Sequence, residues 1–419
     1  MSGLRAPGFP EEEIRARARN GAAGAFPPGA DYGHTVFGAA PAPPVASSDP
    51  LDNARLAPPI FMPERLAKLV ELGREPTYGD VVLDTVIGGL PSPLPVFVSA
   101  LGSTEVASSE LGLATIRQAA RLGLPLVVGE NVGSVNGCRP TGPGPAPAAT
   151  LLPRIEAYVA ELRGKHGGVV VQQNTEDADS EVWNLLYSDP ATQDLLVSGR
   201  MAFELKTGQG AKPGLGGMTV LDAADAARVA GRYVIDTALG TGAALLRSSS
   251  PGTFTEEILR QQIRLMRNNY PRARVWVKLP PVRDVRDAAM TAWSAGADAV
   301  TVDGAEAGTG WAPLSFLQHV GLPLGECLAR IGPHSSCVLA SGRMWEGSRA
   351  VKCLALGATA VGLGRAALLA VDEAPQDGLV NLVECLALEM RLLISALGKY
   401  APGRLGLEDV WATAGSGAT

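Results

Sequence analysis

The sequence predicts an α/β fold: a (β/α)8 TIM barrel with an extended N-terminal arm and C-terminal helices. Three observations support this prediction. Short apolar runs of strand length recur from about residue 94 onward. Most of these runs are continuous, as expected for strands that are buried on both faces of a parallel sheet. Helical segments separate many of them, and strands that alternate with helices indicate βαβ units.

The apolar runs number eight, and eight βα units favour a closed barrel over an open sheet. The predicted strands are Leu94–Val98, Leu124–Val128, Val169–Gln173, Ala202–Lys206, Val275–Leu279, Ala299–Val302, Cys337–Ala340 and Ala360–Leu363. The predicted helices are Ala107–Leu122, Leu221–Ala230, Thr255–Asn268, Asp284–Ala295, Trp345–Leu356 and Val380–Leu397. Gly357 ends the fifth of these helices, and the sixth is amphipathic and is expected on the outside of the barrel.

Residues 1–60 are rich in alanine, glycine and proline and show no sustained period. We expect them to form a partly irregular arm that wraps the main body or stays mobile. His34 lies in this arm, where a lone histidine is more often structural or solvated than catalytic. Residues 61–419 are expected to form the barrel and its C-terminal helical extension.

Bulk composition excludes several classes of function. The 419 residues are 46% apolar and 19% charged, with a net charge of −6 and no basic stripe. Nucleic acid and anionic membranes are therefore not expected as main partners. The N-terminus has three consecutive glutamates and no apolar signal region, and no apolar run reaches the length of a membrane helix. These features predict a cytoplasmic protein.

The five cysteines lie far apart and form no CxxC pair. They are Cys138, Cys327, Cys337, Cys353 and Cys385. We expect reduced thiols that pack as small apolar groups, and neither a disulfide framework nor a metal site.

Two strand ends have the form of phosphate-binding loops. Cys337–Gly347 (CVLASGRMWEG) and Ala360–Arg365 (AVGLGR) each join the end of a strand to a helix start through glycine. Glycine lets the backbone approach a phosphate, and a helix start offers free N–H groups. A single Gly-x-Gly is more often a tight turn. Two such loops after the seventh and eighth strands are a stronger signal, because barrels bind phosphate there.

A third strand end is Glu204–Gly217 (ELKTGQGAKPGLGG), which holds five glycines, two lysines and a glutamine within fourteen residues. Composition alone leaves a solvated flexible loop possible. The segment resembles the KxxQGAKPGxGG motif of glutamate synthases, which lies against flavin and substrate. Ala273–Leu279, Ala297–Pro323, Ser341–Arg365 and Val96–Ser103 are similar to further segments of that family, in the same order. The resemblance runs from about residue 65 to residue 411, and its layout is closest to the short stand-alone form, as in the large subunit of N-methylglutamate synthase.

The resemblance implies that FMN binds at the C-terminal mouth of the barrel. The cofactor-binding residues that it implies are Ser99, Ala100, Lys206, Gln209, Lys278, Asp303, Gly304, Gly308, Thr309, Ser341, Gly342, Arg343, Gly362, Gly364 and Arg365. The catalytic residues that it implies are Lys278, Gln209, Lys212 and Glu130. Two alternatives stay open: Lys278 could instead pair with Asp298 or Asp303, and Glu130 could be a surface carboxylate.

The chain also departs from the family pattern. After Gly364 only Cys385 is present, so the cysteine trio of an iron–sulfur cluster is missing and no cluster is expected. The family's DGGTG reads EAGTG at Glu306–Gly310, its GxGG after the second strand reads GENVGS, and its diproline-dihistidine loop is replaced near Ser248–Thr253. These segments contact the substrate in the family.

The resemblance implies an FMN-dependent oxidoreductase that acts on the C–N bond of an amino acid or a 2-oxo acid through an imine. A glutaminase-like or other subunit could supply ammonia, and a homo-oligomer is expected. Two rival hypotheses remain: a flavoenzyme of specialised metabolism with another substrate, and a non-catalytic flavin-binding subunit of a larger complex.

Overall fold

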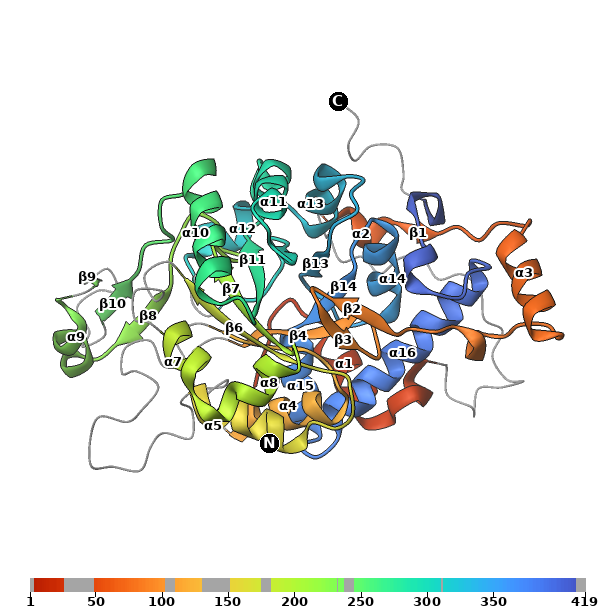
Figure 1. Cartoon of the computed structure of the whole chain (residues 1–419), viewed down its shortest axis with the longest axis horizontal. Coiled ribbons are helices and arrows are strands. Elements are labelled where there is room, and N and C mark those ends of the chain that lie inside the picture. The colour runs from red at the N-terminus through yellow and green to blue at the C-terminus, as the bar shows by residue number, and fades with distance from the viewer. Residues whose placement is uncertain are drawn as a thin grey trace.

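The computed structural model describes residues 4–25, 49–101, 110–129, 151–174, 182–231, 233–236, 245–309 and 312–411. Eight parallel strands close into a barrel in the order β11-β12-β13-β14-β4-β5-β6-β7 (Figure 1). The strands are β4 (Val96–Leu101), β5 (Leu126–Val128), β6 (Val169–Asn174), β7 (Met201–Lys206), β11 (Arg274–Leu279), β12 (Ala299–Asp303), β13 (Val338–Ser341) and β14 (Ala360–Leu363). Each overlaps one of the eight predicted strands, so the predicted barrel is confirmed.

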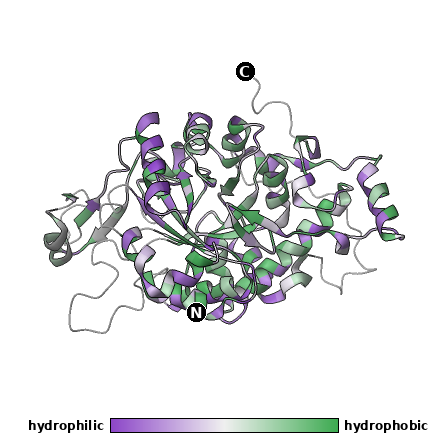
Figure 2. Cartoon of the chain, in the orientation of Figure 1, coloured by the Kyte–Doolittle hydropathy of each residue, from purple (hydrophilic) through white to green (hydrophobic). Residues whose placement is uncertain are grey.

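Helices surround this barrel, and the strands at its centre are largely hydrophobic (Figure 2). The helices after residue 100 are α4 (Glu110–Arg121), α5 (Leu151–Glu161), α7 (Val182–Ser188), α8 (Gln193–Val197), α10 (Glu256–Asn269), α11 (Val285–Ser294), α12 (Leu314–His319), α13 (Leu324–Ile331), α14 (Gly347–Ala355), α15 (Arg365–Glu373) and α16 (Gly378–Ala396). Short 3-10 turns lie at η3 (Tyr78–Asp80), η4 (Pro190–Thr192), η5 (Pro402–Arg404) and η6 (Leu407–Asp409).

The helix ends follow local sequence signals. Thr255 caps α10, because its side chain accepts a hydrogen bond from the N–H of Ile258 at 3.2 Å. Gly357 follows α14 with a φ of +100°, a conformation that favours glycine. The amphipathic C-terminal helix predicted at Val380–Leu397 is α16, which packs against α14 and α15 on the outside of the barrel. Within the described residues, no helix has the length and apolar character that crossing a membrane requires.

The long connection after β7 contains a small antiparallel sheet that the sequence analysis did not predict. Its order is β8-β10-β9, and it lies beside the barrel at the left of Figure 1. The elements are β8 (Met218–Leu221), α9 (Ala223–Val229), β9 (Val234–Asp236) and β10 (Leu245–Ser248). Only the helix was expected here, because strands of three or four residues leave too short a hydrophobic pattern to recognise.

An apolar plug closes the N-terminal end of the barrel. The hairpin of β2 (Thr85–Ile87) and β3 (Leu90–Ser92) places Ile87 and Leu90 among the inward side chains of the strands. These inward side chains belong to Phe97, Val127, Val170, Ala202, Trp276, Ala299, Leu339 and Ala360. The hairpin turns at Gly88, where φ is +52° and the carbonyl accepts a hydrogen bond from Trp276 Nε1 at 3.0 Å. A side chain at Gly88 would collide with that indole ring.

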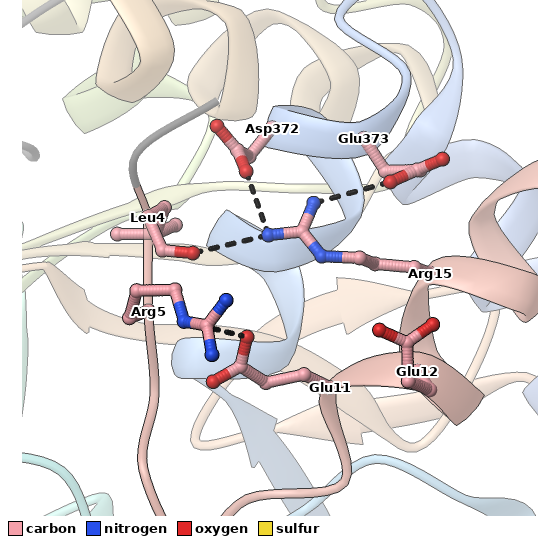
Figure 3. Close-up of a pocket in the computed structure, with 7 residues that line it drawn as sticks. All are labelled: Leu4, Arg5, Glu11, Glu12, Arg15, Asp372 and Glu373. Carbon is pink, nitrogen blue, oxygen red and sulfur yellow. Dashed lines mark hydrogen bonds and ion pairs between the residues drawn. The ribbon is translucent and has the colours of Figure 1, made fainter. Parts of the chain in front are cut away.

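The described part of the N-terminal arm is more regular than predicted. It contains α1 (Glu11–Asn20), η1 (Gly21–Ala25), α2 (Pro50–Asn53), β1 (Arg55–Leu56, paired with β15 at Val410–Trp411) and, after it, α3 (Pro63–Leu72). Ile14 and Ala18, one helical turn apart, are buried where α1 packs on α15 and α16. Arg15 pairs with Asp372 at 2.9 Å and with Glu373 at 3.1 Å (Figure 3). The described helix of the arm therefore packs on the outside of the barrel; His34 lies outside the described residues.

Tyr158 should test how tightly α5 is held on the barrel. Its hydroxyl donates to Leu124 O at 2.7 Å and accepts from Gly168 N at 3.0 Å, in a fully buried position. Tyr158→Phe leaves both backbone groups without this partner, so the free energy of unfolding should fall by about 1–3 kcal/mol. Urea unfolding measures the change. The control is Tyr78→Phe, at a site 47% exposed; equal losses in the two variants would refute this role for Tyr158.

Candidate functional site

The interior of the barrel changes from apolar to polar above the plug. Side chains two positions apart on a strand point to the same side of the sheet. Seven strands carry a polar residue or glycine two positions after their inward apolar residue. These are Ser99, Gln172, Glu204, Lys278, Thr301, Ser341 and Gly362. These residues, hereafter the polar layer, are all buried and lie toward the C-terminal ends of the strands. Active sites of such barrels form at this end.

Glu204 joins three strands within the polar layer. Its Oε1 accepts a hydrogen bond from Thr301 Oγ1 at 2.7 Å, and its Oε2 accepts one from Gln172 Nε2 at 2.5 Å. Burial raises the pKa of Glu204, and the positive charge of Lys278 opposes this rise. The polar layer is therefore a hydrogen-bonded floor that carries both a carboxyl group and an ammonium group.

Lys278 forms an ion pair at the rim of the mouth. Its Nζ lies 3.0 Å from Asp303 Oδ2, and the same oxygen accepts a hydrogen bond from Gly210 N at 3.0 Å. Of the two carboxylates considered for Lys278 in the sequence, Asp303 is the one that pairs. Asp298 instead pairs with Arg267 at 2.6 Å. The Lys278–Asp303 pair thus links β11 and β12 to the glycine-rich loop.

The glycine-rich loop gathers its polar side chains at the mouth. Lys206 Nζ donates to Gln209 Oε1, and Gln209 Nε2 donates to Thr309 Oγ1 at 2.8 Å. Lys206 and Lys212 are only 7% and 3% exposed, which is unusual for lysine. The loop is therefore a packed part of the site, and the interpretation as a solvated flexible loop is wrong.

The loops after β13 and β14 lie side by side, because Ser341 pairs with Gly362 in the parallel ladder. Ser341 Oγ lies 3.1 Å from Ser99 Oγ, and a methyl group at Gly362 would overlap the Ser99 hydroxyl. Gly364 precedes α15, and a side chain built there would meet nothing nearer than Ser99 Cβ at 3.9 Å. The backbone at Gly364 therefore leaves room for a ligand group.

Each of these two loops carries an arginine after its glycine. Arg343 has a φ of +51°, the one positive φ outside glycine among the described residues. Arg365 Nη2 donates to Glu306 O at 2.5 Å, and its guanidinium lies 4.5 Å from the ring centre of Phe9, which belongs to the arm. Burial lowers the pKa of Arg365, and the charge of nearby Arg343 lowers it further. Two close guanidinium groups attract an anion.

An acidic cluster borders the same loops. Arg349 Nη2 lies 2.6 Å from Glu306 Oε1 and 2.5 Å from Asp49 Oδ2. A methyl group at Gly304 or Gly342 would come close to the Glu306 carboxyl group. Burial raises the pKa of Glu306 to about 8, and the charge of Asp49 raises it in the same direction. The positive charge of Arg349 opposes this rise.

Three buried polar atoms of the barrel strands and their loops have no hydrogen-bond partner within the described residues. Two of them are Asp303 Oδ1 and Arg343 Nε; the third, Gln173 Oε1, belongs to the outward-facing side of β6. Buried polar atoms are normally paired, and unpaired ones need an explanation such as a missing ligand. One acceptor above the polar layer and one donor beside the β13 loop suit a ligand with N–H or hydroxyl groups at one end and an anionic group at the other.

Most of the predicted site residues lie at this one mouth. The structure brings together the predicted residues of the polar layer, the Lys278–Asp303 ion pair, the glycine-rich loop and the two arginine loops. Ala100 packs beside the apolar residues below the polar layer, and Gly308 lies against the Arg365 side chain. Glu130 lies outside the described residues. Four described cysteines are free, and Cys138 also lies outside the described residues. No group of described His, Cys, Asp or Glu side chains is placed to hold a metal ion.

The sequence analysis missed two sets of site residues. Glu204, Gln172 and Thr301 are polar residues within the predicted strands, so the sequence did carry a signal for them. Asp49 and Asp52 come from the N-terminal arm, and no local pattern indicates that they reach the β13 loop.

Comparison with known proteins supports the motif assignment. Residues 191–374 match the family model of the conserved region in glutamate synthase. An archaeal-type glutamate synthase [NADPH] of Dehalococcoides mccartyi is 33% identical over 187 residues, which cover 42% of this chain and 36% of that protein. A glutamate synthase large subunit-like protein of Rhizobium meliloti is 34% identical over 180 residues, covering 41% and 40%. The matched region thus spans little more than a third of these relatives.

Solved structures share the barrel architecture. A mutant of (S)-mandelate dehydrogenase aligns over 96% of this chain and 99% of its own, with a TM-score of 0.55 and 17% identity. A flavocytochrome b2 variant with bound sulfite aligns over 88% and 79%, with a TM-score of 0.54 and 15% identity. At these identities the likeness concerns the fold. Residues 191–374 are thus similar to the conserved region in glutamate synthase, and the QGAKPG segment that carried the resemblance lies within this match.

Proposed function

We propose that the barrel mouth binds FMN and that the chain is a flavin-dependent oxidoreductase. The observation that carries this proposal is the pair of arginine-bearing loops after β13 and β14, where Arg343 Nε is buried without a partner in the described structure. Such loops suit one terminal phosphate. A solved structure with the same fold supports the choice, because that mandelate oxidase mutant carries an FMN adduct.

The polar layer and its rim would hold the rest of the cofactor. Asp303 Oδ1 is an acceptor for an N–H or hydroxyl group. The ammonium of Lys278 places a fixed positive charge at the mouth, where it would stabilise negative charge that develops at a flavin ring. FMN supplies hydride exchange with the substrate when bound. The loops after β13 and β14 would hold the phosphate with Arg343 and Arg365.

The substrate in this proposal is an amino acid, a 2-oxo acid or the imine that connects them. One support is the similarity to a glutamate synthase and to a glutamate synthase large subunit-like protein. The other is the positive charge of the loop residues Lys206 and Lys212, which would attract a carboxylate. Gln209, which bonds to Lys206 and Thr309, would contact the cofactor or the substrate. Ammonia would come from another subunit or from solution. Anaerobic titration with single amino acids tests the class, because a true donor substrate bleaches the flavin absorbance.

The bound chromophore should be FMN. The two adjacent loops after β13 and β14 would together bind one terminal phosphate, as FMN has. A dinucleotide site would need a GxGxxG motif at the start of a helix after an early strand, and the sequence has none there. Protein purified after expression should therefore release FMN on heating, identified by chromatography against FMN, FAD and riboflavin standards. Its spectrum should show flavin bands without broad iron–sulfur absorption. Release of FAD, or a folded protein that binds no flavin when titrated with FMN, contradicts the proposal.

Lys278 should set the flavin reduction potential. Lys278→Met alone leaves the buried Asp303 carboxylate without its ion pair. The double variant Lys278→Met/Asp303→Asn removes both charges and is therefore measured beside it. Loss of a preorganised charge of this kind costs about 3 kcal/mol, or about a hundredfold in the rate of flavin reduction. The potential should fall in both variants that lack the ammonium group and stay near the parental value in Lys278→Arg. A parental potential and rate in the folded double variant would show that Lys278 does not face the flavin.

FMN affinity should fall as pH rises past about 8. The pKa of Glu306 is raised to about 8, so this side chain is neutral below that pH and negative above it, beside the Gly342 loop. The new charge would repel the phosphate. Glu306→Gln should remove the pH dependence between pH 7 and 9 in fluorescence titrations with FMN, whereas Glu326→Gln, on the outer helix α13, should keep it. A pH dependence that persists in Glu306→Gln assigns it to another group.

A further inference from the structure

Residues 49–53, hereafter the docking segment, connect the N-terminal arm to the arginine loop after β13. Asp49 caps α2 by accepting a hydrogen bond from Leu51 N at 3.1 Å, and it also accepts one from Gly325 N at 3.1 Å. Leu51 is 1% exposed, and its carbonyl accepts a hydrogen bond from Lys352 Nζ at 2.8 Å. The docking segment is therefore fixed between α13 and α14.

Asp52 bridges two arginines from this position. Its Oδ2 lies 2.6 Å from Arg343 Nη1, and its Oδ1 lies 2.7 Å from Arg349 Nη1. The guanidinium of Arg343 is thus held at one end, while its buried Nε has no hydrogen-bond partner within the described residues. A planar guanidinium that is anchored through one nitrogen presents its remaining N–H groups in a fixed direction.

We propose that Asp52 is a positioning residue for the cofactor phosphate, and that the docking segment is therefore part of the cofactor site. This inference rests on the FMN site proposed above. Asp52 would hold Arg343 in the orientation in which Nε donates to a phosphate oxygen. The left-handed backbone at Arg343, with φ of +51°, is held from the side-chain end by the same contact.

Two effects of Asp52 oppose each other. Its negative charge repels a phosphate, and its two ion pairs keep two guanidinium groups in place. Asparagine has a single acceptor oxygen, so Asp52→Asn can hold only one of the two arginines and turns an amide N–H₂ toward the other. The repulsion acts from behind Arg343, whose own charge lies nearer to the phosphate. We therefore expect the loss of orientation to dominate, and the variant to bind phosphate more weakly.

Linkage then couples the cofactor to the arm. If phosphate binds more tightly when the docking segment is in place, phosphate must stabilise the docked segment by the same factor. FMN should therefore slow amide hydrogen exchange in residues 49–53. Riboflavin, which has the same ring system without the phosphate, should not.

The experiment compares FMN and riboflavin binding in three proteins. They are the parent, Asp52→Asn and the control Asp372→Asn, which breaks an ion pair between the arm and the barrel at Arg15 (Figure 3). Fluorescence titration of flavin-free protein gives both dissociation constants, and thermal melting checks the fold. We expect Asp52→Asn to weaken FMN binding by about tenfold and to leave riboflavin binding unchanged. Asp372→Asn should bind both flavins as the parent does.

The other outcomes separate the two proposals. If the parent binds FMN no better than riboflavin, the phosphate site fails and this inference fails with it. If the parent prefers FMN and Asp52→Asn binds FMN equally well or more tightly, the proposed function stands and the role of Asp52 is wrong. A similar loss for both flavins in Asp52→Asn, or a similar loss of FMN in Asp372→Asn, would show a general role in stability and would also overturn the positioning role.

Discussion

The alternation of side chains inside a closed parallel barrel is the constraint on which the rest of this structure depends. Every second residue of a strand points into the barrel. If one residue of each strand forms an apolar layer, the residues two positions later form the next layer of the interior. The apolar level around Trp276 meets the plug of the β2–β3 hairpin. The next level is polar and contains Glu204 and Lys278, and the site loops lie above it.

The fold was predictable from the sequence because the strands of a parallel sheet are buried on both faces and therefore appear as continuous apolar runs. Its glycine and lysine motifs also located the mouth, since loops after neighbouring strands converge there. Four residues of the polar layer were predicted, but Gln172, Glu204 and Thr301 were missed. Glu204 is buried with hydrogen bonds to Gln172 and Thr301 on other strands, and these partners are not visible in the sequence. The β8–β10 sheet was missed because its strands are too short to show a period.

Charge balance at the arginine loops depends on contacts that no local pattern reveals. Asp52 lies almost three hundred residues before Arg343 in the chain, yet their side chains are 2.6 Å apart. Buried arginines need such partners, because a desolvated charge is costly unless it is paired. Asp52 of the arm thus neutralises part of the positive charge of Arg343 and Arg349, whereas Arg365 donates to a backbone carbonyl. The charge of Arg365 favours an anion at these two loops.

The most direct measurement of the central claim is a crystal structure of the protein loaded with FMN. The account predicts that the phosphate lies between the loops after β13 and β14, within hydrogen-bond distance of Arg343 Nε and the backbone at Gly364. It also predicts that the flavin ring lies over the polar layer, with Lys278 at its edge. A flavin bound elsewhere, or a phosphate that contacts neither arginine loop, would contradict the account.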